Sequence, residues 1–198
     1  MGYTHYWRQL RDFTDTEWQE LTRLTKLITA DGLGVLAHHP DAINGDEYYG
    51  EKEDDVFTID SEQIRFNGIG KDGHETFLIT KKKRDLYDYE KQDSIQDAYM
   101  HHKSGGGVFN FCKTAHKPYD KYVVAVLCAL YNLSDAPPQS NRSAHPMSEI
   151  TSDGNTEDWT EGLFHAVRST RQEEMYCPIR DCLTLSYVDY VDQQKKTG

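Results

Sequence analysis

Three basic side chains precede the start of an apolar helix in the middle of the chain. Lys113, His116 and Lys117 stand just before Pro118, and an almost uniformly apolar stretch follows at 122–130. Proline is favoured at the first helical position, where its missing N–H is not needed, so we expect a helix to begin at Pro118. The free N–H groups and partial positive charge of a helix N-terminus attract anions. These residues therefore predict an anion or phosphate site.

The same block also suits a structural role. Asp120 can interact favourably with the helix N-terminus and pair with Lys113 or Lys121. The block would then be a solvated basic face in front of a core helix. The Asp120 carboxylate would also compete with a bound phosphate for the helix N–H groups, unless it orients a lysine or acts as a base. Both interpretations stay open.

A second group of polar and aromatic residues opens the chain. Tyr3, His5 and Trp7 alternate with other residues at the period of a strand. If this strand lies beside the one that begins at Val108, the two groups face one pocket. Arginine and lysine would neutralise phosphate, threonine would donate a hydrogen bond, and a ring would stack on a base. The residues that we predict to bind the ligand are Tyr3, His5, Trp7, Arg8, Lys113, Thr114, His116 and Lys117.

The function that these residues favour is binding of a small anionic, nucleotide-like ligand, with sequestration of a signalling nucleotide as one use. A phosphoester hydrolase is the first alternative, in which Lys113 and Lys117 hold the transition-state charge. Its candidate catalytic residues, which transfer or orient a proton, are His5, His116 and Asp120. The chain carries none of the common phosphate-loop, serine-elbow or zinc-protease motifs, so enzymatic activity stays open. A protein-interaction module that uses the acidic stretch at 40–60 is the second alternative.

Composition restricts the partners. The 198-residue chain has a net charge of −11, which disfavours extended nucleic acid because phosphates would be repelled outside a local basic pocket. No apolar run is long enough to span a bilayer, and residues 1–8 lack the order of a signal peptide. We therefore expect a cytoplasmic protein without a membrane partner, and homo-oligomerisation stays open.

The cysteines and histidines predict neither a disulfide scaffold nor a metal centre. The 4 cysteines are few for a chain of this length. Cys177 and Cys182 lack both the two-residue gap and the second pair that a structural zinc site usually has. Adjacent histidines at 38–39 and 101–102 point to opposite faces of an extended chain. We expect no cofactor and no bound metal.

The elements that must position these residues form an α+β domain. We expect a mixed or antiparallel sheet of about four to six strands covered by about three helices. Thr14 with Glu17 forms a capping box, and Phe13 with Trp18 a hydrophobic staple. Besides Thr14, the expected helix starts lie near Pro118 and Thr156; the expected strands after the first lie at 64–68, 75–80, 108–112 and 149–154. A single domain would cover 1–170, with irregular insertions near 40–60 and 85–107, and 171–198 would be a C-terminal extension.

Several sequence blocks together resemble a known family. These are the opening Gly-Tyr-Thr-His-Tyr-Trp at 2–7, the stretch 64–68, the Phe-Cys-Lys-Thr-Ala-x-Lys-Pro-Tyr-Asp block at 111–120, and Ser-Asp-Gly at 152–154 with Trp159. The chain is similar over residues 1–168 to a family of small uncharacterised proteins of bacteriophages, bacteria and some fungi. The resemblance implies that the opening and the 111–120 block share one structure. It implies no catalytic residues, and a phage setting would suit capture of a host nucleotide signal.

Overall fold

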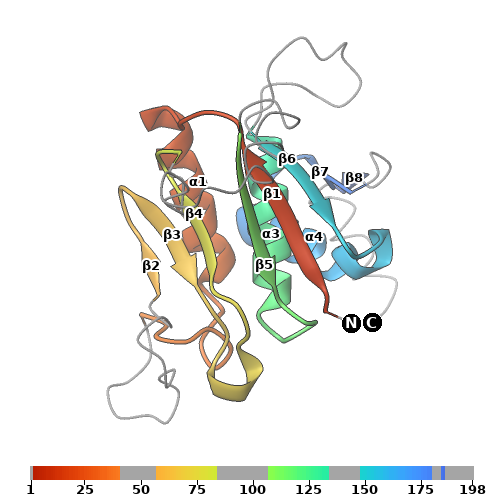
Figure 1. Cartoon of the computed structure of the whole chain (residues 1–198). Coiled ribbons are helices and arrows are strands. Elements are labelled where there is room, and N and C mark those ends of the chain that lie inside the picture. Colours follow the sequence, from red (N-terminus) through yellow and green to blue (C-terminus); the bar gives the residue numbers. More distant parts are fainter. Residues whose placement is uncertain (1, 41–56, 84–106, 134–147, 180–183, 186–198) are drawn as a thin grey trace, which may run out of the picture.

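The computed structural model describes residues 2–40, 57–83, 107–133, 148–179 and 184–185 (Figure 1). Its fold is α+β, as the sequence predicts, with three α-helices over antiparallel strands in these described ranges. The helices are α1 (Asp15–Thr29), α3 (Asp120–Asn132) and α4 (Thr156–Thr170). Most of the predicted insertions near 40–60 and 85–107, and much of the predicted extension at 171–198, lie outside the described residues.

The strands of the described part divide between two three-stranded sheets and one two-stranded sheet. One sheet has the order β5-β1-β6 and contains β1 (Thr4–Gln9), β5 (Val108–Lys113) and β6 (Ser148–Ser152). The second has the order β2-β3-β4 and contains β2 (Thr58–Ile59), β3 (Gln63–Phe66) and β4 (Phe77–Thr80). The short pair is β7 (Met175–Tyr176) and β8 (Thr184–Leu185). β3 and β4, which lie at the strands predicted for 64–68 and 75–80, form an antiparallel hairpin through the 3-10 turn η1 (Gly70–Asp72).

The central strand β1 determines where the helices begin. It pairs antiparallel with both β5 and β6, so β5 and β6 run in the same direction. Each of these two strands is followed by a helix, α3 after β5 and α4 after β6, and both helices pack behind the sheet (Figure 1). The N-termini of α3 and α4 therefore lie at the same end of the sheet, beside the start of β1.

The helix α3 is the centre of the hydrophobic core. Every residue from Tyr122 to Leu130 is buried, because α3 is enclosed by the sheet on one side and by α1 and α4 on the other. The contact between α3 and α4 is close at Gly162, where an added Cβ would lie 2.3 Å from Val124 Cγ1. Any larger side chain at Gly162 would push the two helices apart. The helix ends at Asn132, with Leu133 as its C-cap.

The start of α3 differs from the sequence prediction by two residues. The helix begins at Asp120, and Pro118 lies in the turn before it. The Asp120 N–H donates to the Lys117 carbonyl at 2.8 Å, which is a tight three-residue turn rather than a turn of α-helix. Pro118 therefore directs the chain into the helix without being its first residue.

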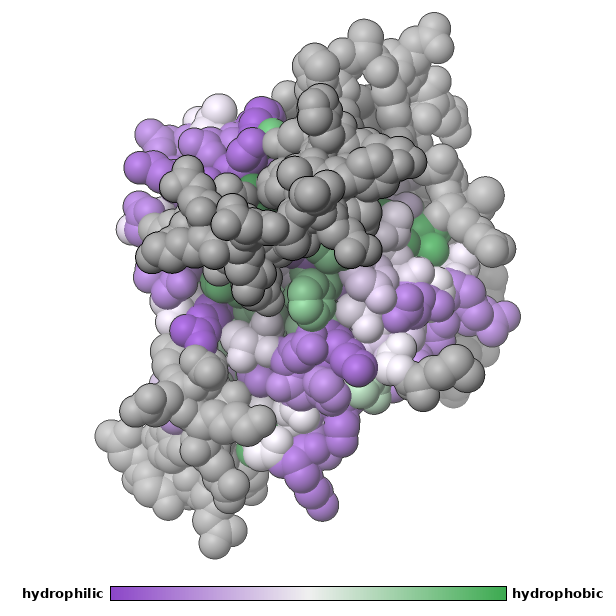
Figure 2. Space-filling view, in the orientation of Figure 1, coloured by the Kyte–Doolittle hydropathy of each residue, from purple (hydrophilic) through white to green (hydrophobic). Residues whose placement is uncertain are grey.

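The face of the β5-β1-β6 sheet away from the helices carries exposed aromatic side chains. Phe109 and Phe111 are 53% and 42% exposed, and the Tyr6 ring stacks on Phe109 with centroids 5.9 Å apart. Figure 2 shows hydrophobic surface on this side of the molecule, surrounded by hydrophilic side chains. The opposite face of the same strands is buried against α3 and α4, which gives β1 and β5 their alternating pattern.

The capping box and the hydrophobic staple at the start of α1 are both confirmed. Thr14 and Glu17 cap each other reciprocally, and the Phe13 and Trp18 rings pack with centroids 5.3 Å apart. The Trp18 indole N–H also donates to the Asp60 carbonyl at 3.0 Å. Trp18 is only 2% exposed, so α1 is attached to the β2–β3 turn by a buried ring and a hydrogen bond.

We predict that the Thr14 cap and the buried Trp18 ring contribute different amounts to the free energy of unfolding. Thr14→Ala removes one cap and should lower the free energy of unfolding by about 1 kcal/mol, whereas Trp18→Ala leaves a cavity and should lower it by roughly 3–5 kcal/mol. Thr16→Ala, at an exposed position of the first turn, is the matched control and should change it by less than about 0.5 kcal/mol. Urea unfolding measures all three. Equal, near-zero losses for Thr14→Ala and Trp18→Ala would contradict the proposed role of both residues.

Glu17 should also make stability depend on pH. Hydrogen bonds from Arg11, with further help from Thr14, lower the Glu17 pKa from 4.5 to about 2. The Glu17 carboxylate is therefore protonated at a lower pH in the folded state than in the unfolded chain. The stabilisation that it provides is complete above pH 4.5 and disappears as the pH falls toward about 2. Glu17→Gln should be less stable than the wild type at neutral pH, and the difference should vanish at the acid end of this window. A difference that stays constant with pH, measured by denaturant unfolding, would exclude the carboxylate as its source.

Candidate functional site

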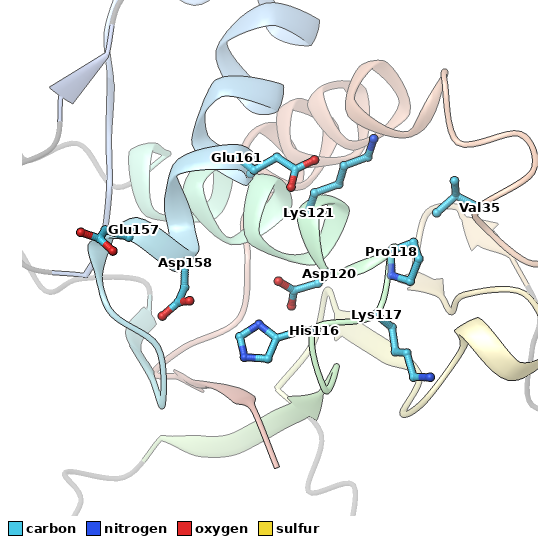
Figure 3. A pocket seen from close by; sticks show the side chains of 10 residues that line it. Val35, His116, Lys117, Pro118, Asp120, Lys121, Glu157, Asp158 and Glu161 are labelled. Carbon is cyan, nitrogen blue, oxygen red and sulfur yellow. The ribbon is translucent and has the colours of Figure 1, made fainter. Parts of the chain in front are cut away.

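A pocket of about 420 Å³ opens between the N-termini of α3 and α4 (Figure 3). One wall comes from the loop before α3, which carries His116 and Lys117, and the other from the first turns of α4. Its charged lining residues are Lys117, Lys121, Asp120, Glu157, Asp158 and Glu161. The volume lies within the range of small-molecule sites, roughly 300–1,000 Å³. The location follows from the sheet, because β1 forces both helices to start at this end.

A buried hydrogen-bond network lies behind the pocket wall. The His5 ring is fully buried, with its Nε2 2.8 Å from Asp120 Oδ1 and its Nδ1 3.1 Å from Ser152 Oγ. The Thr114 hydroxyl donates to the same Asp120 oxygen. Since a carboxylate only accepts, Nε2–H donates to it, and in the neutral ring Nδ1 accepts from the Ser152 hydroxyl. The network ties β1, β5, β6 and α3 together and orients Asp120, whose side chain is 15% exposed.

These residue types resemble a serine–histidine–aspartate triad, but their bonds describe a structural role. Ser152 Oγ also accepts the Gly154 N–H at 3.0 Å, so it stabilises the turn between β6 and α4. His5 has no exposed surface, so a ligand in the pocket cannot contact it. We interpret His5 as a residue that positions Asp120.

The turn that carries His116 has an unusual backbone. Ala115 and His116 both adopt left-handed conformations, with φ of 52° and 55°, and the Lys117 N–H closes the turn on the Thr114 carbonyl at 3.0 Å. Consecutive residues of this kind form a type I′ turn, which favours asparagine and glycine. Alanine and histidine are strained there, and such strain persists only when the surroundings hold it.

Tyr3 holds this turn in place. Its carbonyl accepts the N–H groups of Thr114 and Ala115, each at 3.1 Å, and its ring stacks on His116 with centroids 3.7 Å apart. The histidine ring is therefore fixed at the pocket wall although His116 itself is exposed.

The Tyr3 hydroxyl is buried near the Ser152 side chain. Burial, followed by the negative charge of Asp120, raises the Tyr3 pKa. Tyr3 lies against Gly154, where an added Cβ would be 2.5 Å from the ring. The glycine at 154 thus makes room for the ring at the start of α4.

The pocket is lined by side chains of both charges, which are unevenly distributed. The lining contains two lysines and four carboxylates. In Figure 3 the side chain of Lys117 lies at one end and those of Glu157 and Asp158 at the other, with the His116 ring between the carboxylates of Asp120 and Asp158. One end of the pocket thus attracts an anion, and the opposite end accepts hydrogen bonds from a donor.

The backbone at the start of α4 is already capped. The Asn155 side chain accepts the N–H groups of Glu157 and Asp158 at 2.7 and 3.3 Å, and the Asp158 carboxylate accepts the Asn155 N–H at 2.8 Å. These N–H groups are therefore not available to a ligand. The groups of this pocket that favour an anion are therefore the lysines, His116 and the partial charge of the helix termini, and the capped N–H groups of α4 add none.

The structure brings part of the predicted site together. His116, Lys117 and the candidate Asp120 line the pocket, while His5, Thr114 and Tyr3 form the layer behind it.

Three other predicted residues lie elsewhere. Trp7 packs on Phe77 in the core with centroids 5.1 Å apart, and Arg8 pairs with Glu149 at 3.1 Å toward the other end of β1. The aliphatic part of the Lys113 side chain packs over Gly2, where an added Cβ would lie 1.9 Å from Lys113 Cε.

The sequence analysis missed the half of the pocket that α4 supplies, and also Lys121 of α3. Glu157, Asp158 and Glu161 of α4 line the pocket but were not among the predicted residues. Asn155 and Asp158 form a capping box, which was a detectable signal for a helix start. The spacing of Glu157 and Glu161, four residues apart, places both on one face of that helix.

Comparisons with known proteins add no relative: no protein-family model, curated protein or solved structure matches the chain. The family resemblance described above stays a prediction. Within the described ranges, no helix has the length and apolar character needed to cross a membrane. No group of three or more histidine, cysteine or acidic side chains is placed to bind a metal ion among those same residues.

The strained turn leads to a test of the backbone conformation. Ala115→Gly removes the Cβ from a left-handed position and should raise the free energy of unfolding by about 1 kcal/mol. Ala30→Gly is the matched control, because Ala30 is exposed and has an ordinary φ of −58°; it should lower the free energy of unfolding by roughly 0.5–1 kcal/mol. Thermal and urea unfolding measure the two changes. Destabilisation of similar size in both variants would show that Ala115 is not left-handed.

Proposed function

We propose that the pocket between α3 and α4 binds a small ligand with an anionic group at one end and hydrogen-bond donors at the other, and that the ligand is nucleotide-like. The observation that carries this proposal is the uneven distribution of charge along the pocket, with Lys117 at one end and the carboxylates of Glu157 and Asp158 at the other (Figure 3). A phosphate meets the first requirement. The exocyclic amines and ribose hydroxyls of a nucleotide meet the second.

The basic wall is suited to an anion of small size. Lys117 is half-buried, and its ammonium donates to the Lys71 carbonyl at 2.9 Å, which keeps the side chain extended along the pocket edge. An ammonium has three donors, so two remain for a phosphate oxygen. The partial positive charge at the start of α3 adds to this attraction.

The acidic wall selects the rest of the ligand. Glu157 and Glu161 are exposed carboxylates of α4, and they accept hydrogen bonds but donate none. Bare phosphate or a simple polyanion would be repelled by this wall, whereas a base with an amino group would be bound. His116, fixed on Tyr3, adds a flat ring against which a base can stack.

Binding is favoured over hydrolysis by the position of the histidines. The histidine that the Asp120 network orients is His5, which is fully buried and has both ring nitrogens bonded. A hydrolase would have to use His116 alone as its proton-transfer group. The interaction-module alternative relies on the acidic stretch at 40–60, most of which lies outside the described residues.

The first experiment identifies the ligand and its fate. Purified protein is incubated with pools of nucleotides and cyclic nucleotides, and the supernatant and the heat-released material are analysed by mass spectrometry. Intact ligand in the heat-released fraction supports binding. Altered ligand in the supernatant, together with loss of that turnover in His116→Gln, would replace the binding proposal by the hydrolase alternative.

The second experiment tests the basic wall with the recovered nucleotide. Lys117→Glu should weaken binding at least about tenfold, because a charge-assisted hydrogen bond contributes roughly 1.5–3 kcal/mol. Lys82→Glu, the same charge change at an exposed site away from the pocket, is the control and should leave affinity within about twofold. Titration calorimetry measures both, and circular dichroism verifies folding. Equal affinities of wild type and a folded Lys117→Glu variant would refute the assignment of Lys117.

A further inference from the structure

Two buried cysteines lie together along α3, away from the pocket. Cys128 is in α3, eight residues beyond Asp120 and thus about 12 Å along the helix axis. Cys177 directly follows β7, and both side chains have no exposed surface. These two thiols come from elements far apart in the sequence, and the pocket chemistry uses neither of them.

Asn132 holds the two elements in register. It lies four residues after Cys128, so the two side chains share one face of α3. The Asn132 amide donates to the Tyr176 carbonyl at 2.8 Å and accepts the Tyr176 N–H at 2.9 Å. This two-point clamp fixes the backbone next to Cys177 against the face of α3 that carries Cys128.

The clamp brings the two buried thiols close together, because Cys177 directly follows Tyr176 and Cys128 lies one helical turn before Asn132. Burial raises the pKa of Cys128, while its interaction with Cys128 lowers the pKa of Cys177. Cys177 is therefore the thiol of the pair that becomes a thiolate first, which is the form that attacks a disulfide.

Cys112 provides an internal contrast. Its thiol donates to the Glu75 carbonyl at 3.3 Å and lies 4.0 Å from the Tyr119 hydroxyl. Its pKa is raised, mainly by burial. Within the described part of the chain, all three cysteines are free thiols, and the interactions of Cys112 involve no second sulfur.

We propose that Cys128 and Cys177 are a reversible disulfide site that attaches the segment after β7 to α3. The oxidant is a low-molecular-weight disulfide of the glutathione type. The Cys177 thiolate attacks one of its sulfurs and expels one thiolate, which forms a mixed disulfide. Cys128 then loses its proton and attacks the Cys177 sulfur, which expels the second thiolate. Two protein thiols are oxidised to one disulfide, and the small disulfide is reduced to two thiols.

Access to the buried pair requires only local opening. β7 and β8 are strands of two residues each, and so short a pair opens more readily than the core of α3. A disulfide here would close a long loop of the chain and stabilise the folded state, since it restricts the unfolded chain more for longer loops. The clamp by Asn132 means that little rearrangement is needed to form it.

Tryptic peptide mapping tests this proposal directly, because each cysteine falls in its own peptide. Cys128 lies in 122–142, Cys177 in 172–180, and Arg180 separates Cys177 from Cys182. The folded full-length protein is equilibrated with reduced and oxidised glutathione, free thiols are blocked, and the digest is analysed without reductant. We expect the linked peptides 122–142 and 172–180, lost on reduction, with Cys112 blocked as a free thiol throughout.

A stability measurement supplies the second readout. The oxidised wild type should unfold several degrees higher than the reduced form, and Cys177→Ser should abolish this difference, whereas Cys112→Ser should retain the linked peptides. The proposal is overturned if no link between 122–142 and 172–180 forms in the folded protein, or if the linked pair is a different one. Because peptide mapping of the wild type decides this, a poorly folded variant does not affect the result.

Discussion

The antiparallel pairing of β1 with both of its neighbours is the constraint on which the pocket depends. A strand between two others that run opposite to it makes those two parallel to each other, and each is followed by a helix that returns behind the sheet. α3 and α4 must therefore start at the same end. The tight contact at Gly162 brings the helices together, and the space left between their first turns is the pocket.

The buried polar groups behind that space keep its shape. His5 has no exposed surface, yet both ring nitrogens have partners from other elements, Asp120 of α3 and Ser152 of β6. In a low-dielectric interior such a network is stable only when every member is bonded. The same region holds two left-handed residues in one turn, fixed by the Tyr3 carbonyl and ring. Hydrogen bonds and stacking thus position His116 and Asp120 before any ligand arrives, which reduces the entropy lost on binding.

The proposal that this acidic protein binds an anion depends on the local electrostatics of the pocket. With a net charge of −11, the molecule as a whole repels polyanions, so attraction has to be local. Lys117 and the start of α3 contribute positive charge that attracts an anion, and the carboxylates of α4 on the other wall oppose this attraction. Under the proposed function, this combination would disfavour a simple polyanion and favour a ligand with two chemically different ends, so that selectivity would arise from repulsion as well as attraction.

The sequence by itself determined the elements, and the tertiary structure decided which of their side chains meet. Helix starts at Thr14 and Asn155 and the alternation in β1 are local signals, encoded within a few residues by capping and periodicity. The same alternation put Tyr3, His5 and Trp7 on one face, but a strand rises about 3.3 Å per residue, so Trp7 lies over the core against Phe77 while Tyr3 lies at the pocket. The acidic wall could not be predicted, because Glu157 and Glu161 line the same pocket as Lys117 only through the register of β6 on β1 and the packing of α4 on α3. The register of β6 on β1 joins residues more than a hundred positions apart, and the packing of α4 on α3 joins Gly162 to Val124, so no local pattern encodes either contact.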